Sequence, residues 1–215
     1  MQLPRPKPPR VTLEGRYARL EPLSTIHAAD LYAASSGAGA GQRFAYLADP
    51  VPADAADLHR WVAANAVKED PLFWAVVDEA TGQVGGRQAL MRITPEHGVI
   101  EIGHILWGPA IARGRVATEA LYLAARHIFE DLGYRRFEWK CNNLNEPSKA
   151  AARRFGFSYE GLFRQHMWVK GANRDTAWFA MLDGEWPGLK RRFERWLDPA
   201  NFDAAGRQKA RLQDL

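Results

Sequence analysis

The chain has 215 residues, of which 47% are hydrophobic and 25% charged, a balance typical of an ordinary globular protein with one substantial core. Its 29 basic and 25 acidic residues leave a net charge of +4, which suits an anionic small ligand and does not require a nucleic-acid partner. The single cysteine, Cys141, excludes an internal disulfide framework, and without an apolar stretch of about 18 residues or a signal-type start we expect a cytoplasmic protein with no membrane helix.

Composition divides the chain into three parts. Residues 1–10 (MQLPRPKPPR) are rich in proline and basic side chains, which predicts an extended, disordered arm. Residues 11–198 carry the periodic apolar pattern of one folded domain. Residues 199–215 are mostly polar and are expected to form a tail.

The first part of the domain contains a hairpin and two helices. Residues 11–13 and 17–23 predict two short strands around a turn. Ser24 is the expected N-cap of a helix of about three turns, and Asp54 that of a second helix ending near residue 68. Residues 35–52 between these helices are expected to be irregular.

A meander of three strands comes next, at residues 73–78, 84–94 and 99–107, with turn residues between them. Apolar side chains at helical spacing then predict a long amphipathic helix that ends near residue 132. The strand at 134–141 is expected to run parallel to the strand at 99–107, because a whole helix separates the two.

The last elements are a second crossover helix at 145–155, a hairpin of strands 158–169 and 176–182, and a terminal helix at 185–197. This order of antiparallel strands, a β-α-β-α unit and a final hairpin predicts an α/β domain with one mixed sheet.

A basic turn, Arg113-Gly114-Arg115, joins the central strand to the long helix. The first N–H groups of a helix have no partner within it, and the helix dipole is positive at this end. The turn is therefore a candidate anion site, with a phosphate-bearing ligand as its natural occupant. An ordinary strand-to-helix connection with solvated arginines is the alternative.

Residues 109–120 read PAIARGRVATEA, which resembles the acetyl-CoA pyrophosphate loop of the GNAT superfamily, in particular the branch with the ribosomal-protein N-terminal acetyltransferases. That pattern is Arg/Gln-x-x-Gly-x-Gly/Ala followed by Thr-Glu-Ala. Here Ala112 stands at the leading position and Arg115 at the second glycine. The resemblance implies the GNAT fold and acetyl-CoA as the cosubstrate, bound by Ile105, Leu106, Trp107, Arg113, Gly114, Arg115, Val116, Ala117, Thr118 and Asn145.

A second GNAT pattern, Asn-x-x-Ser with a helix that ends in Gly-Phe, is similar to Asn145, Ser148 and Gly156-Phe157. By this resemblance Asn145 hydrogen-bonds the pantetheine arm of CoA, and Ser148 is a catalytic residue near the departing sulfur. The structural alternative is that Asn145 only begins a helix and Ser148 is a hydroxyl of its first turn.

The general base has several candidates. Glu101 and His104 lie on the central strand, on opposite faces unless a bulge intervenes. In the ribosomal-protein branch a glutamate stands at the position of Met167, so the neighbouring His166 is the nearest substitute. Glu101 and His166 are therefore the predicted catalytic groups beside Ser148. The six histidines show no metal-ligand spacing, and no metal is predicted.

These features predict an N-acetyltransferase that moves acetyl directly from acetyl-CoA to a primary amine, either a protein N-terminus or a small molecule. In GNAT proteins the helices after the first strand line the acceptor cleft, which makes Phe44, Tyr46 and Trp61 candidate contacts. Two other classes stay open: a GNAT-fold protein that binds CoA or a nucleotide without catalysis, and a basic nucleic-acid module. The oligomeric state is open, with a homodimer among the possibilities.

Overall fold

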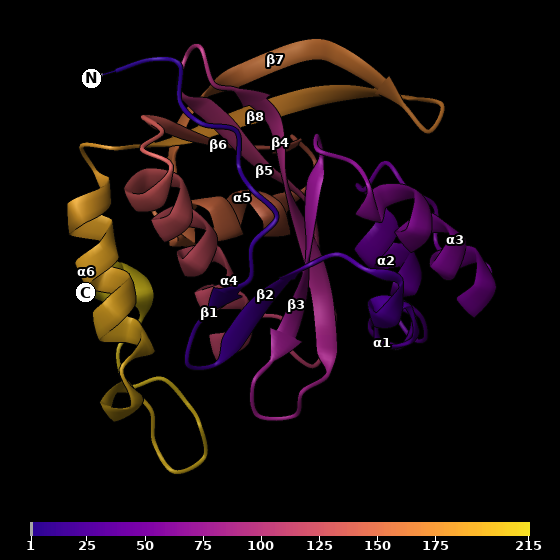
Figure 1. The fold of residues 1–215 in the computed structure, drawn as a ribbon, viewed down its shortest axis with the longest axis horizontal. Coiled ribbons are helices and arrows are strands. Elements are labelled where there is room, and N and C mark those ends of the chain that lie inside the picture. Colours follow the sequence, from indigo (N-terminus) through magenta and orange to yellow (C-terminus); the bar gives the residue numbers. More distant parts are fainter. Residues whose placement is uncertain (1) are drawn as a thin grey trace.

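The computed structural model describes residues 2–215, in which eight strands form one sheet in the order β1-β2-β3-β4-β5-β6-β8-β7 (Figure 1). Neighbouring strands are antiparallel, except for the parallel pair β5 and β6. The strands are β1 (Leu13–Glu14), β2 (Ala18–Pro22), β3 (Leu72–Asp78), β4 (Val84–Thr94), β5 (Val99–Trp107), β6 (Arg136–Asn142), β7 (Ser158–Val169) and β8 (Ala172–Leu182). The helices are α1 (Ala28–Ser35), α2 (Ala40–Phe44), α3 (Ala55–Ala66), α4 (Arg115–Arg126), α5 (Glu146–Arg154) and α6 (Trp186–Leu197).

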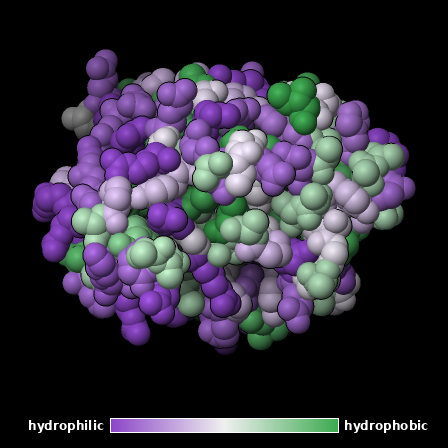
Figure 2. All heavy atoms as spheres, turned by 90° about the horizontal axis from the view of Figure 1, so that it is seen from below, coloured by the Kyte–Doolittle hydropathy of each residue, from purple (hydrophilic) through white to green (hydrophobic). Residues whose placement is uncertain are grey.

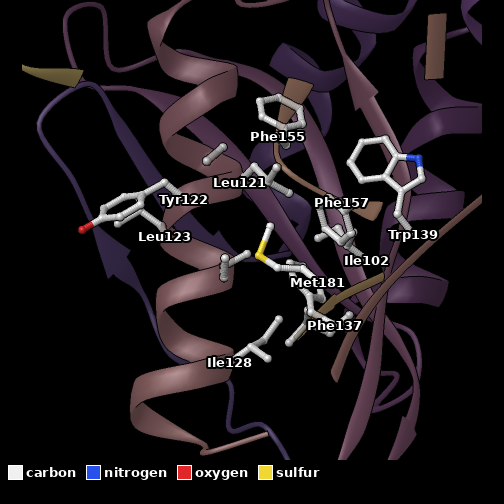
Figure 3. Close-up of a cluster of buried hydrophobic side chains, with 14 of the residues drawn as sticks. Ile102, Leu121, Tyr122, Leu123, Ile128, Phe137, Trp139, Phe155, Phe157 and Met181 are labelled. Atoms are coloured by element: carbon white, nitrogen blue, oxygen red, sulfur yellow. The ribbon is translucent and has the colours of Figure 1, made fainter. Parts of the chain in front are cut away.

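Helices cover both faces of the sheet (Figure 1). On one face, α4 packs its apolar stripe on the central strands, and Figure 3 shows Leu121 and Ile128 directed toward Ile102, Phe137 and Met181. On the other face, α1 and α3 enclose a smaller buried cluster against β3 and β4. Burial of these two apolar faces is the main favourable contribution to folding.

Successive side chains of a strand point to opposite faces of the sheet, and this determines which face carries the polar residues of β5 and β6. Ile100 and Ile102 of β5, and Phe137 and Trp139 of β6, belong to the core under α4. The residues between them therefore project from the opposite face, the one that carries α1, α2 and α3. We call this face of β5, β6 and β8 the acceptor face.

Most predicted elements are present, and β4, β5 and β7 have the predicted bounds. The helix expected after Ser24 is shorter than predicted, because a 3-10 turn at residues 25–27 precedes α1 and leaves Ile26 79% exposed. The short helix α2 lies within the segment predicted to be irregular. The long helix has a π-helical end at residues 127–131.

Both terminal segments differ from their prediction. The disordered arm predicted for residues 1–10 is wrong over residues 2–10, because Arg5 N–H donates to the Pro95 carbonyl (2.9 Å) and Tyr134 Oη donates to the Pro6 carbonyl (3.1 Å). Residue 1 lies outside the described residues. The predicted tail also packs on the domain, since Leu212 is buried and Trp196 Nε1 donates to Gln208 Oε1 (2.8 Å).

Hydrophilic residues dominate the face seen in Figure 2, with hydrophobic ones in small groups. Within residues 2–215, no helix has the length and apolar character needed to cross a membrane.

Candidate active site

The two parallel strands separate at the middle of the sheet. Their pairing runs from Val99–Arg136 to Ile102–Trp139 and then stops, so that residues 103–107 of β5 have one strand edge without a partner strand. A cleft of about 220 Å³ opens where they part. Gly108 N–H donates to the Gly85 carbonyl, and since N–H groups alternate along a strand, the N–H of Trp107 faces the open edge.

A β-bulge redirects the central strand at His104. This residue has a φ of 50°, and the β4–β5 register shifts so that Gly103 pairs with Ala89 and Leu106 with Arg87. The one extra residue on β5 breaks the strict alternation. Glu101 and His104 consequently line the same cleft.

Glu101 belongs to an ion-pair network on the acceptor face. Its side chain is buried, and its carboxylate accepts from Lys140 Nζ (2.9 Å) and from Arg92 Nη1 (2.7 Å). Lys140 is also buried; it pairs with Glu138 (2.7 Å) and lies 3.7 Å from the centre of the Trp178 ring. Both charge-assisted bonds engage the same oxygen, Oε2, and the two cations stabilise the ionised carboxylate, which favours a supporting role over direct proton abstraction.

His104 lies beside a carboxylate that the sequence did not single out. Its Nδ1 is 3.7 Å from Asp49 Oδ2, and Asp49 also accepts from Arg87 Nη2 (2.8 Å) and Trp61 Nε1 (3.0 Å). Burial opposes ionisation of Asp49, but its contacts with His104 and Arg87 outweigh burial and hold the pKa of this carboxyl well below its usual range. The imidazole of His104 in the cleft therefore lies beside the negative charge of Asp49.

Asp49 belongs to the segment between α2 and α3, which covers the cleft. Tyr46 lines the cleft and donates its hydroxyl to the Leu144 carbonyl (3.2 Å). Lys170, in the turn between β7 and β8, donates to the carbonyls of Phe44 and Asp49 (2.9 Å each). Of the predicted aromatic contacts, Tyr46 lies at the cleft, whereas Phe44 is in the interior and Trp61 stacks on Arg87 (3.9 Å).

His166 is exposed and is not among the described residues that line the cleft, whereas its neighbour Met167 lines it. The His166 Nδ1 is 2.9 Å from Thr176 Oγ1. Burial and then the positive charge of Arg174 lower the pKa of His166, with further cations adding to the shift. The cations Arg174, Arg92 and Lys140 therefore act on His166 in the same direction as burial.

The Asn145 and Ser148 side chains both line the cleft and begin helix α5. Asn145 Oδ1 accepts from the Ser148 N–H (3.1 Å), and Ser148 Oγ accepts from Trp139 Nε1 (3.0 Å). The N-cap role is therefore present, and it leaves the Asn145 amide N–H groups for a ligand. Burial raises the pKa of the Cys141 thiol although its hydrogen bond with Ser148 opposes this, which disfavours Cys141 as a nucleophile.

The turn before α4 has the features of an anion site. Gly114 is the N-cap and no side chain caps the helix; among residues 2–215, no partner uses the N–H groups of Arg115, Val116 and Ala117. Arg113 is exposed and adopts the left-handed conformation, with a φ of 62°. These groups form a cradle that fits a phosphate.

Other residues of this motif are structural. The Arg115 guanidinium lies over the rings of Tyr17 (4.9 Å to the ring centre) and Phe202 (5.0 Å). The side chain at the second glycine position of the pattern therefore packs on two aromatic rings. Thr118 is buried, and its Oγ1 donates to the Gly114 carbonyl (2.9 Å). Glu119 accepts from the Ala18 N–H (2.7 Å), which holds α4 against β2.

No group of three or more metal-ligating side chains occurs within the described part of the chain, residues 2–215.

A mixed sheet with parted central strands, an uncapped helix start after β5 and an asparagine-capped helix after β6 together define an acyltransferase architecture. The family model described as "Acetyltransferase (GNAT) domain" matches residues 18–158. The chain belongs to this family of acetyltransferases.

Three relatives give the extent of the similarity. A GCN5-related N-acetyltransferase structure from Brucella melitensis is 57% identical, with a TM-score of 0.97 over 99% of this chain and 96% of that one. A GNAT-family structure from Chromobacterium violaceum is 38% identical, with a TM-score of 0.79 over 87% and 93% of the two chains. A Bacillus subtilis protein named as a ribosomal N-acetyltransferase, YdaF, is 28% identical over 109 residues, which is 51% of this chain and 59% of that protein.

Proposed function

We propose that this protein is an acetyl-CoA-dependent N-acetyltransferase whose acceptor is a primary amine. The observation that carries this proposal is the cleft at the parting of β5 and β6. The cleft connects a free strand edge to the His104–Asp49 pair, and the phosphate cradle before α4 follows the same strand. A cytoplasmic location remains a prediction.

The cosubstrate would be held by backbone more than by side chains. The N–H groups of residues 115–117 and the Arg113 side chain suit the pyrophosphate. The open edge at residues 105–107 suits the amide groups of the pantetheine arm, with the Asn145 amide N–H groups at its other side. Ala117 and Thr118 have buried side chains, so their contribution is confined to main chain and to shaping the turn.

In the reaction, the nitrogen lone pair of a neutral amine forms the new C–N bond, and the electron pair of the C–S bond leaves with the thiolate. His104 takes the proton that the nitrogen loses, and the negative charge of Asp49 stabilises the imidazolium that results. The N–H of Trp107 is available to the oxygen that gains negative charge. Ser148 lines the cleft and offers a hydroxyl to the departing sulfur.

The acceptor is more consistent with an α-amine or a small-molecule amine than with an ordinary lysine. An α-amine has a pKa near 7.7–8.0 and costs about 1 kcal/mol to deprotonate at pH 7. A lysine near 10.4 costs roughly 4–5 kcal/mol. A histidine base is sufficient to deprotonate an α-amine. The glutamate of the ribosomal-protein branch is replaced here by Met167.

The test combines binding and transfer. The purified protein is incubated with acetyl-CoA and a panel of amines: a peptide with a free N-terminus, the same peptide blocked but with an internal lysine, and a polyamine. Thiol release and the mass of the product report transfer, and the thermal shift reports binding.

We expect acetylation of the free N-terminus or the small amine, and a loss of about 100-fold or more in turnover for His104→Gln with an unchanged thermal shift. Binding without transfer to any amine would favour a non-catalytic CoA-binding protein. No binding of acetyl-CoA, together with salt-dependent DNA binding, would favour the basic nucleic-acid module.

A further inference from the structure

The cleft has more positive than negative charge on the acceptor face. Four cationic side chains line it, and Glu101 is the one carboxylate among the lining residues that the structure describes. Two of the cations are neutralised, since Arg92 pairs with Glu101, and Lys140 with Glu101 and Glu138. The other two are Arg43 and Arg174.

Arg174 lacks an anionic partner. On β8 it lies opposite Met167 of β7, and it is half-buried. Its one side-chain hydrogen bond joins Nε to Thr176 Oγ1 (3.2 Å), and no carboxylate of residues 2–215 pairs with it within 4.0 Å. A partly buried guanidinium without a counterion is unfavourable in the free protein and favourable when an anion binds.

Arg43 adds a second cationic group to the same cleft. Its Nη atoms donate to the carbonyls of Ser35, Ser36 and Ala38, which fixes the guanidinium against the end of α1. Its Nε is buried without a hydrogen-bond partner among the described residues. These carbonyls carry no full negative charge, so the side chain keeps its net charge at the cleft.

The cosubstrate does not account for these groups. The phosphates of acetyl-CoA would lie at the turn before α4, and the pantetheine arm and thioester are uncharged. Arg174 projects from the acceptor face, because the alternating neighbours Ala177 and Phe179 of β8 are part of the core under α4. An anion on Arg174 would therefore come from a molecule other than the cosubstrate.

We infer that the acceptor amine carries a carboxylate close to its nitrogen, and that Arg174 binds this carboxylate. The inference rests on the proposed acetyl transfer and names the class of its acceptor. An acidic side chain near a peptide N-terminus and the α-carboxylate of an amino acid share this chemistry. Arg43 adds to the positive field that attracts the acceptor.

The experiment uses two pairs of acceptors that differ by one carboxylate, and each rate is expressed per neutral amine because a neighbouring carboxylate raises the pKa of the amine. In the peptide pair, the second residue is aspartate or asparagine; in the small-molecule pair, alanine is compared with alaninamide. Acetyl transfer is measured for each member, and binding of the N-acetylated peptides is measured by calorimetry with the CoA-saturated protein. The variants are Arg174→Gln, Arg174→Lys and, as a matched control, Arg164→Gln, which removes an exposed arginine of β7 outside the cleft.

We expect kcat/KM to favour the charged member of one pair by about tenfold or more, and the preferred pair identifies the source of the carboxylate. Arg174→Gln should abolish the preference, Arg174→Lys should restore part of it, and Arg164→Gln should leave it unchanged. The acetylated aspartyl peptide should bind more tightly than its asparaginyl partner if peptides are the source.

Equal rates within both pairs would overturn the inference and leave acetyl transfer intact. A preference that survives in Arg174→Gln would overturn the assignment to Arg174. If no amine is acetylated, the proposed function fails, and the calorimetry still decides the anion site: a charge preference that depends on Arg174 supports it, and none overturns it.

Discussion

Asp49→Asn tests the buried ion pair under the cleft. The substitution keeps the size of the side chain and an oxygen that can accept from Trp61, but it removes the charge opposite Arg87. The side chain of Arg87 is 2% exposed and that of Asp49 is 20% exposed. Because the variant leaves a buried guanidinium without its counterion, we expect a large loss of stability.

The magnitude follows from the burial of the pair. Removing one partner of a buried pair costs about 3–5 kcal/mol, and the partial exposure of Asp49 argues for the lower end, about 3 kcal/mol. For a chain of this size, that loss corresponds to a Tm lower by roughly 6–12 °C. The exposed pair of Asp57 and Arg60 provides the matched control, since Asp57→Asn should cost less than about 1 kcal/mol.

The pH dependence has a defined sign. The pKa of Asp49 is lower in the folded protein than its ordinary value of 3.8, so its contribution to stability is complete above pH 4 and is lost as the pH falls further. The variant lacks this carboxyl. The difference in stability between the parent and Asp49→Asn should therefore persist down to about pH 5 and should shrink below about pH 4.

Urea unfolding at several pH values measures both quantities, with a further variant as a cross-check. In Asp49→Asn with Arg87→Met, the unpaired charge is removed as well, and much of the lost stability should return because replacing both partners of a buried pair is often close to neutral. A single variant as stable as Asp57→Asn would refute the reasoning. So would a double variant less stable than the single one.

Three further predictions concern the cosubstrate and the proton transfer. Acetyl-CoA should raise the Tm of the parent, and Arg113→Glu with Gly114→Asp should remove most of that shift; an unchanged shift would mean that the phosphates bind elsewhere. Asn145→Ala should cost about 1 kcal/mol in urea unfolding as a lost cap and weaken CoA binding, whereas Ser148→Ala should lower kcat with little change in binding; normal kcat in a less stable Ser148→Ala would leave only a structural hydroxyl. His166→Ala should lower kcat by less than about tenfold, well short of the effect of removing a positioned base, and its pH–rate profile should keep the parent's shape.

Long periodic segments were predictable from the sequence. The meander of β3, β4 and β5, the parallel β6 and the long α4 follow from apolar spacing and turn residues, which depend on the nearest neighbours in the chain. The 3-10 turn after Ser24 and the short helix α2 were missed, since small-residue segments carry little periodicity. The order of residues 2–10 depends on contacts with Pro95 and Tyr134, far along the chain.

The candidate site was predictable where a motif determines it. Asn145, Ser148 and the turn at Arg113-Gly114 follow from spacing and from the resemblance to the family. Asp49 carries no local signal, because it meets His104 only after the segment from α2 to α3 folds over the cleft. The bulge that turns His104 into the cleft is likewise a property of the β4–β5 register.

The positive charge of the cleft bears on how an enzyme of this kind can work without the glutamate of its branch. The cationic side chains that line the cleft disfavour the ammonium form of a bound amine and lower its pKa. Each unit of such a shift removes about 1.4 kcal/mol from the cost of deprotonation. An acceptor carboxylate on Arg174 would position the amine while screening part of this field, so the amine should lie nearer to His104 than to Arg174. The neutral Met167 can then stand where the branch has a carboxylate, because the positive charge of the cleft lowers the free energy needed to deprotonate the amine.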